Sequence, residues 1–287
     1  MSDRMHSDAD TRRAEMRERW DAAAPGWARR RRDLQEMGMP VSVRMIELLA
    51  PQPGQQLLEL AAGPGDTGFL AAELVQPGGT LICSDASEAM LAIARRRAEE
   101  LGLHDVEFRQ LELEWIDLPT ASVDGVLCRW GLMLALDPAA AAREIRRVLR
   151  PGGRAAVAVW DAAEHNPWGT VPVRALIELG YADPPEPGGP GPFALSGEGQ
   201  LERLLADAGF VEISVERLTL ARRNHSFEDM LAETLDISPT FATMYRALSD
   251  DQRANVNERL KALTRPFADE SGAVTLPGRS LVAGAEA

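Results

Sequence analysis

Lysine and cysteine are both scarce in this chain of 287 residues. Of its 31 basic residues only Lys261 is a lysine, so Schiff-base chemistry has a single candidate nucleophile, in a polar helical pattern. The two cysteines, Cys83 and Cys128, lie on separate apolar runs, and two thiols so spaced make neither a zinc cluster nor a disulfide framework. We therefore expect no metal site, and a reducing, cytoplasmic location.

Positive charge and long apolar runs are also in short supply. The formal net charge is −13, which repels nucleic-acid backbones unless basic residues are concentrated in a patch. The one dense arginine run, residues 29–32, is interpreted as a solvated helix face paired with nearby acids. No apolar run approaches 18 residues and the first residues are polar, so we expect neither a membrane span nor a signal peptide.

Short apolar runs alternate with amphipathic stretches along most of the chain, which is typical of a doubly wound α/β sheet. The runs predict strands near residues 56–61, 80–84, 106–109, 123–129, 154–160, 210–220 and 279–284. Helical patterns fall near residues 67–75, 87–102, 138–149, 168–180, 198–208, 226–236, 239–247 and 249–266.

The composition of the chain and its apolar pattern predict four segments. The first is a helical lid over residues 1–40, interrupted at Pro25-Gly26, and the second is a Rossmann-like core over residues 41–160. A cap insertion at residues 161–196 contains a proline- and glycine-rich loop at 184–192 that cannot be helical. Residues 197–287 complete the sheet and carry a second helical cap insertion at 225–268.

A glycine-rich turn follows the first predicted strand. Gly63, Gly65 and Gly68 satisfy G-x-G-x-x-G, and Asp85 follows 20 residues after Gly65, as in a dinucleotide fingerprint. Asp66, however, stands where the next helix begins, and a carboxylate there repels a pyrophosphate while suiting the helix dipole. A nucleoside without phosphates fits better, and S-adenosylmethionine is one.

The segment 57–68, LLELAAGPGDTG, resembles the first motif of class I S-adenosylmethionine-dependent methyltransferases. Further matches follow in order, at CSDASEAM (83–90), LELEWIDLP (111–119), VDGVLCRWG (123–131) and RVLRPGG (147–153). The set is similar to the group that includes the ubiquinone/menaquinone C-methyltransferases. The resemblance implies a seven-stranded, mostly parallel Rossmann-like sheet with helical cap insertions. It also implies S-adenosylmethionine as cofactor and S-adenosylhomocysteine as product.

The resemblance also assigns cofactor-binding residues. Asp85 would accept both ribose hydroxyls, although it could also cap the following helix. Glu59 would orient the glycine loop or reach the amino group of the cofactor. Met90 would pack on the ribose or adenine, or simply join the core. The remaining residues of this part of the site are Ala61, where the family usually has glycine, Gly63, Gly65 and Ala86.

Two further pairs would bind the ends of the cofactor. Glu112 would accept from the adenine amino group and the Leu113 amide would donate to the ring, the alternative for Glu112 being a solvated loop acid. Arg129 would bind the carboxylate of the cofactor or an anionic acceptor. Trp130, at the position facing the transferred methyl group, is expected to wall the pocket on the side of the acceptor, or to serve as a core aromatic.

The lid and caps would enclose the acceptor. Trp27, just after the Pro-Gly break, would swing over the cofactor, or act as a hydrophobic staple between helices. Trp168 and Tyr181 are expected at the acceptor, and His165 is the candidate base. Methyl transfer can also proceed by proximity alone.

The expected activity is therefore methyl transfer to a carbon or oxygen nucleophile of a small molecule, such as a quinone, an isoprenoid or a natural product. An enclosed pocket favours a small acceptor over nucleic acid. Two alternatives stay open, an NAD-dependent oxidoreductase and a catalytically silent interaction protein that binds S-adenosylmethionine. The pattern makes no prediction of oligomeric state.

Overall fold

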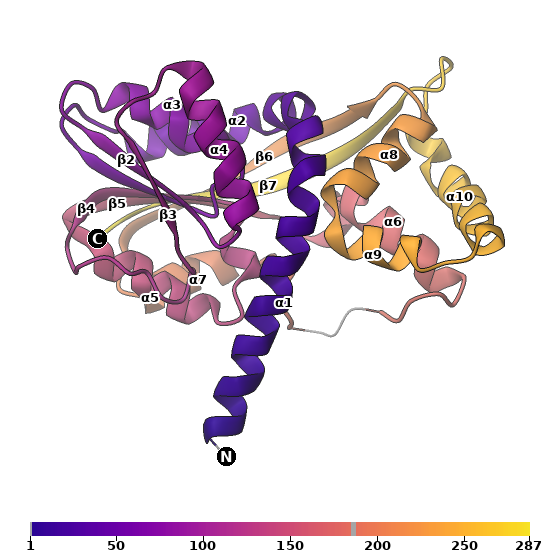
Figure 1. Ribbon diagram of the computed structural model, residues 1–287, viewed down its shortest axis with the longest axis horizontal. Helices are drawn as coiled ribbons and strands as arrows, with labels where there is room; N and C mark the ends of the chain where they lie inside the picture. Colours follow the sequence, from indigo (N-terminus) through magenta and orange to yellow (C-terminus); the bar gives the residue numbers. More distant parts are fainter. Residues whose placement is uncertain (1, 185–187) are drawn as a thin grey trace.

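The computed structural model describes residues 2–184 and 188–287 (Figure 1). Part of the predicted proline- and glycine-rich loop, residues 185–187, lies outside the described residues. A seven-stranded sheet forms the centre, in the order β3-β2-β1-β4-β5-β7-β6. Its strands are β1 (Gln56–Leu60), β2 (Thr80–Asp85), β3 (Val106–Gln110), β4 (Val123–Arg129), β5 (Leu149–Trp160), β6 (Val211–Asn224) and β7 (Val274–Glu286).

The first five strands pair in parallel, and β7 runs antiparallel between β5 and β6. The predicted seven-stranded, mostly parallel sheet is therefore confirmed. The last two strands are longer than predicted, because they continue as a ribbon in which Asn224 pairs with Val274. This ribbon carries the sheet toward the cap helices (Figure 1).

Two helical layers cover the sheet. The helices α2 (Arg31–Leu49), α3 (Asp66–Leu74) and α4 (Glu88–Leu101) lie above it in Figure 1, and α5 (Pro138–Val148) and α7 (Gln200–Asp207) lie below. The central strands are therefore mainly apolar on both faces, as their short apolar runs predict. Their fully buried side chains include Leu57, Leu58, Val126 and Leu127.

A group of cap helices stands at one side of the sheet (Figure 1). Phe241, Leu176 and Val256 belong to the small apolar core that these helices share. Ser226 and Ser249 cap two of them with side-chain hydrogen bonds, which explains why their starts were predictable. The group comprises α6 (Pro167–Glu178), α8 (Phe227–Ile237), α9 (Pro239–Arg246) and α10 (Asp250–Thr264).

The N-terminal segment differs from its prediction. Helix α1 (Ser2–Arg29) runs unbroken through Pro25, so the predicted interruption at Pro25-Gly26 is wrong. Proline removes only one helical hydrogen bond, and the packing of α1 against α8 stabilises the continuous helix. The chain bends at Arg30 instead, and α2 then continues across the predicted segment boundary at residue 40. In the described parts of the chain, no helix is both long and apolar enough to span a membrane.

Candidate functional site

A pocket opens at the carboxyl ends of β1, β2 and β4, where the strand order reverses. Open α/β sheets bind their ligands at such a switch point. Most of the predicted cofactor-binding residues line this pocket together with Trp130: Trp27, Glu59, Ala61, Gly63, Asp85, Ala86, Met90, Glu112, Leu113 and Arg129. The structure thus brings together residues that lie as many as 103 positions apart in the sequence, Trp27 and Trp130.

The glycine loop after β1 has left-handed backbone at several positions. Ala61 has φ +50°, which is strained for a residue with a side chain, and Gly63 has φ +54°. Gly65 is outside the pocket lining, and a Cβ there would meet the ring of Phe69 at 2.5 Å. The geometry therefore supports a packing role for Gly65, whereas Gly63 faces the pocket.

Asp85, the last residue of β2, has both carboxylate oxygens fixed by backbone amides. Gly63 N–H donates to Oδ2 at 2.8 Å and Ser87 N–H to Oδ1 at 2.9 Å. Burial raises the pKa of Asp85 to about 6, and the nearby charges of Asp21 and Glu112 add to the effect. The side-chain cap of α4 comes from Ser87 itself, so the capping alternative for Asp85 is wrong.

Glu59, on β1, is buried beneath the same loop. Its Oε1 accepts from Gly68 N–H at 2.8 Å, which holds the start of α3 against the strand. Within the described residues, Oε2 has no hydrogen-bond partner. Burial raises the pKa of Glu59 to about 8, so its carboxyl is mainly protonated at neutral pH. Glu59 thus orients the loop and keeps one oxygen available to a ligand.

Asp66 does not act as the sequence suggests. Its carboxylate is 4% exposed, is absent from the pocket lining and is paired with Arg97 and Arg129. Because two guanidinium groups neutralise it, Asp66 presents no repulsive charge to a phosphate in the pocket. The argument from Asp66 against a dinucleotide is therefore wrong, and the choice of ligand depends on other observations.

Trp130 forms a rigid wall. Its ring stacks on Trp160 at 4.3 Å between centroids, Arg129 covers it at 4.8 Å, and its Nε1 donates to Ser280 at 3.0 Å. Its φ of +57° is unusual for a bulky residue and marks a backbone held by its surroundings. Trp168 lies against Trp160, at 4.5 Å between ring centroids, and is not part of the pocket lining.

Helix α1 covers the pocket and is joined to its rim. Arg17 donates to Glu112 at 2.6 Å, and Ser87 Oγ donates to Asp21 at 2.5 Å. The residues of α1 that line the pocket besides Trp27 were missed, although their spacing of three, four and seven marks one helix face. They are Arg13, Met16, Arg17 and Trp20.

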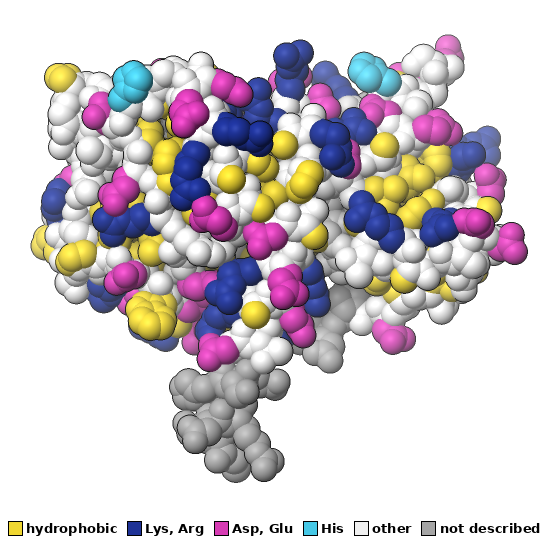
Figure 2. Space-filling view, in the orientation of Figure 1, with side chains coloured by type: hydrophobic (Ala, Val, Ile, Leu, Met, Phe, Trp, Pro, Cys, Tyr) yellow, Lys and Arg dark blue, Asp and Glu magenta, His cyan; other side chains and the backbone are white. Residues whose placement is uncertain are grey.

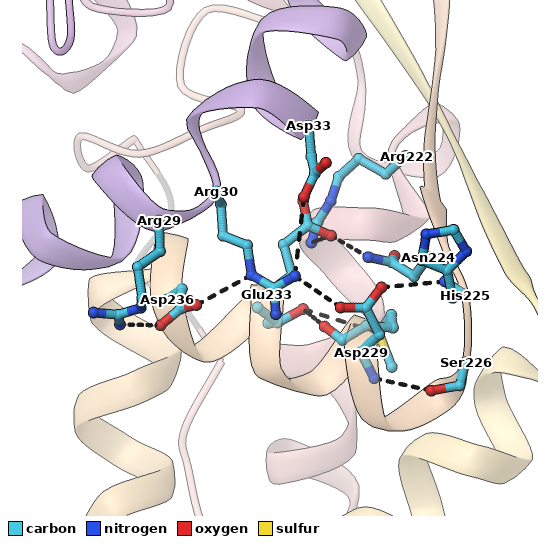
Figure 3. A network of polar contacts seen from close by, with 12 residues as sticks. Arg29, Arg30, Asp33, Arg222, Asn224, His225, Ser226, Asp229, Glu233 and Asp236 are labelled. Carbon is cyan, nitrogen blue, oxygen red and sulfur yellow. Dashed lines mark hydrogen bonds and ion pairs between the residues drawn. The ribbon is translucent and has the colours of Figure 1, made fainter.

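The end of α1 is anchored on α8, as Figure 3 shows for the arginines. Arg30 bridges Asp229 at 2.7 Å and Asp236 at 3.1 Å, and Arg29 also pairs with Asp236. Trp27 Nε1 donates to the carbonyl of Ile237 at 3.1 Å. The expected pairing of the arginine run with acids is thus observed for its first two members.

The comparisons with known proteins agree with this geometry. Residues 60–157 match the family model described as a methyltransferase domain. These residues form a class I S-adenosylmethionine-dependent methyltransferase domain.

Relatives of this domain are known from sequence and from structure. The chain is 31% identical over 122 residues to the ubiquinone/menaquinone biosynthesis C-methyltransferase UbiE of Shewanella frigidimarina, covering 42% of this chain and 49% of that protein. It is 37% identical over 119 residues to nocamycin O-methyltransferase of Saccharothrix syringae, covering 42% of each. The chain thus spans less than half the length of these relatives.

Solved structures share the fold at low sequence identity. The YcgJ protein of Bacillus subtilis superposes with a TM-score of 0.58 at 18% identity, covering 86% of this chain and 98% of that one. Phosphoethanolamine N-methyltransferase 2 of Haemonchus contortus was solved with phosphomonomethylethanolamine and S-adenosylhomocysteine. It superposes with a TM-score of 0.52 at 19% identity, covering 85% of this chain and 52% of that one. The predicted Rossmann-like methyltransferase fold is therefore confirmed.

Three residues predicted at the acceptor lie away from the pocket of the methyltransferase domain. His165 lines a separate cavity with Glu164 and Arg174, and Tyr181 packs against the apolar core of the cap helices. Trp168 is separated from the pocket by the stacked Trp160. The geometry therefore gives no support to His165 as a base for a reaction in this pocket.

Proposed function

We propose that this chain transfers the methyl group of S-adenosylmethionine to a small-molecule acceptor and releases S-adenosylhomocysteine. The observation that carries the proposal is the carboxylate of Asp85. It faces the pocket at the switch point, and the amides of Gly63 and Ser87 fix its orientation. Each oxygen keeps a second lone pair, so the group can accept from the two hydroxyls of a ribose diol.

The other residues of the pocket match the remaining parts of this cofactor. Glu112 and the amide of Leu113 would receive the adenine, with Met90 and Ala86 packed beside it. Arg129 and Glu59 offer a donor and an acceptor to the amino-acid tail. The bound cofactor would supply an electrophilic methyl group on a sulfonium. The chain would bind and orient it, and α1 would exclude water.

The acceptor is proposed to be a small molecule with a carbon or oxygen nucleophile, such as a quinone, an isoprenoid or a natural product. Two observations support a small acceptor: α1 closes over the pocket, and Trp20, Trp27 and Trp130 give it an aromatic wall. Two of the relatives are named as a C-methyltransferase and an O-methyltransferase. Proximity and orientation are the contributions that this pocket makes to catalysis. A cytoplasmic location belongs to the same proposal.

The proposal predicts a selective stabilisation by ligand. S-adenosylhomocysteine at a hundred times its Kd should raise the free energy of unfolding by about 2.7 kcal/mol, and NAD should leave it unchanged. Thermal unfolding of the chain with each ligand measures this. Stabilisation by NAD alone would contradict a methyltransferase and favour an oxidoreductase. Release of S-adenosylhomocysteine in an acceptor screen would then separate an enzyme from a silent binding protein.

The position of Trp27 predicts a second effect, on ligand release. Trp27→Ala removes both a wall of the pocket and the bond to Ile237, so S-adenosylhomocysteine should dissociate about tenfold faster, as expected for losing part of an indole contact. Trp27→Phe keeps an aromatic wall and should change the rate less. Stopped-flow displacement measures both rates. A staple between helices predicts instead a lower melting temperature with an unchanged dissociation rate.

A further inference from the structure

Three buried charged side chains from different elements meet behind the glycine loop. Asp66 begins α3, Arg97 lies on α4 and Arg129 ends β4, and their side chains are 4%, 6% and 9% exposed. Arg97 pairs with one oxygen of Asp66, and Arg129 Nη2 donates to the other at 3.3 Å. A single carboxylate is therefore shared by two guanidinium groups.

Arg97 is also bonded to the glycine loop itself. Its Nη1 donates to the carbonyl of Pro64 at 3.2 Å, and its guanidinium lies over the ring of Phe69 at 5.5 Å. Its position is therefore fixed independently of any ligand. Because Arg97 and Arg129 share the carboxylate of Asp66, its single negative charge cannot neutralise both guanidinium groups.

Arg129 is consequently left with unused binding capacity. Its Nη1 is buried and, among the described residues, has no hydrogen-bond partner. Nη1 lies in the space left by the missing side chain of Gly38 on α2, since a Cβ there would collide with it. Two guanidinium groups against one carboxylate leave the cluster with one net positive charge, and a buried, unmatched charge is costly. Arg129 also lines the pocket, so an anionic ligand there can balance this charge.

We propose that Arg97 is a positioning residue: by neutralising Asp66, it leaves Arg129 free to bind the carboxylate of the cofactor's amino-acid tail. This inference rests on the proposed function and goes beyond it, because it assigns a role to a residue outside the pocket. Arg13 and Arg17 are weaker candidates for the carboxylate, since they are more exposed and lie within 4.0 Å of Glu114 and Glu112.

The test compares two ligands that differ only in the carboxylate: S-adenosylhomocysteine and its decarboxylated form, which keeps the amine. Calorimetric titration of the full chain should show a preference of about 10- to 100-fold for S-adenosylhomocysteine. Arg129→Met should abolish this preference, so that the two ligands bind with Kd values within about twofold of each other. If the wild-type chain binds both ligands equally, the inference is wrong and Arg129 is available to an anionic acceptor.

Arg97→Met should also lose most of the preference, because Asp66 can then pair fully with Arg129 and cancel its charge. Arg97→Lys should keep most of it. The double variant Asp66→Asn/Arg97→Met restores one net positive charge on Arg129, and the preference should return to within threefold of wild type. A purely structural role for Arg97 predicts no such return.

Two outcomes would overturn the assignment of Arg97: an unchanged preference in Arg97→Met, or a double variant no more selective than Arg97→Met. If Arg97→Met does not fold, Arg97→Gln replaces it, since glutamine can still donate to Asp66 but carries no charge. The same loss is expected. Binding of neither ligand to the wild-type chain would instead contradict the proposed function, so the two failures are distinguishable.

Discussion

Asp85→Ala should weaken the binding of S-adenosylhomocysteine by about 1.5–3 kcal/mol, or roughly 10- to 150-fold in Kd. The variant removes the group proposed to accept both ribose hydroxyls and also the acceptor for Gly63 and Ser87. Calorimetric titration measures the affinity, and thermal unfolding of the free protein measures the structural cost. An unchanged affinity with a lower melting temperature would show that Asp85 only holds the loop.

The pH dependence of S-adenosylhomocysteine binding tests the same contact, with Asp85→Asn as the matched control. The pKa of Asp85 is raised to about 6, so below that pH its carboxyl gains a proton and loses acceptor capacity. Affinity should fall as the pH decreases through 6, by at most about tenfold per unit. Asp85→Asn should bind more weakly and show a flat profile between pH 5 and 7. Glu59, with a pKa of about 8, titrates outside this window. A wild-type profile that is flat there would argue against a direct contact with Asp85.

The core of the fold was predictable because its signals are local. Uninterrupted apolar runs such as residues 155–160 favour buried strands, and Ser87, Ser226 and Ser249 mark helix starts through their own side-chain bonds. The pocket was predictable for a related reason. The carboxyl ends of parallel strands lie at the same edge of the sheet, so Asp85 and Arg129 both line the pocket there despite their separation in the sequence.

The remaining features depend on contacts that no local pattern records. Pro25 indicates a break, but the packing of α1 against α8 keeps the helix continuous. Asp66 looks like a free helix-terminal acid, because its partner Arg97 is 31 residues away and pairs with it only once α4 is folded. His165 follows a strand end as a catalytic base might, yet it lies in another cavity. In each case a tertiary contact decides the role.

Charged residues on the surface are interspersed in sign in the face that Figure 2 shows, so surface pairs are numerous. Such pairs contribute little individually, and the pair of Lys261 with Glu258, at 3.3 Å, is a typical example, being 47% and 76% exposed. The pair formed by Arg222 of β6 and Glu233 of α8 is different. Both side chains are 4% exposed and they are 2.9 Å apart.

Glu233→Leu should therefore lower the free energy of unfolding by about 3–5 kcal/mol, because it leaves the guanidinium of Arg222 buried without its carboxylate. Asn224, which donates to Glu233, loses its acceptor as well. The double variant Arg222→Met/Glu233→Leu should recover most of the loss, since apolar side chains of similar volume suit a buried site. Glu258→Gln, on α10, is the exposed control and should cost no more than about 1 kcal/mol.

Urea denaturation of the wild-type chain and the three variants measures these free energies of unfolding. The loss of the buried pair should also affect the pocket. Helix α8 carries Glu233 and also Asp229 and Asp236, which anchor Arg30 at the end of α1 (Figure 3). Loosening α8 should therefore release α1 and speed the dissociation of S-adenosylhomocysteine, as is expected for Trp27→Ala, and the double variant should restore the rate. If Glu233→Leu unfolds within 1 kcal/mol of wild type, the pair is not a buried anchor. If stability falls while dissociation is unchanged, α1 is held over the pocket by its bonds to the rim rather than by α8.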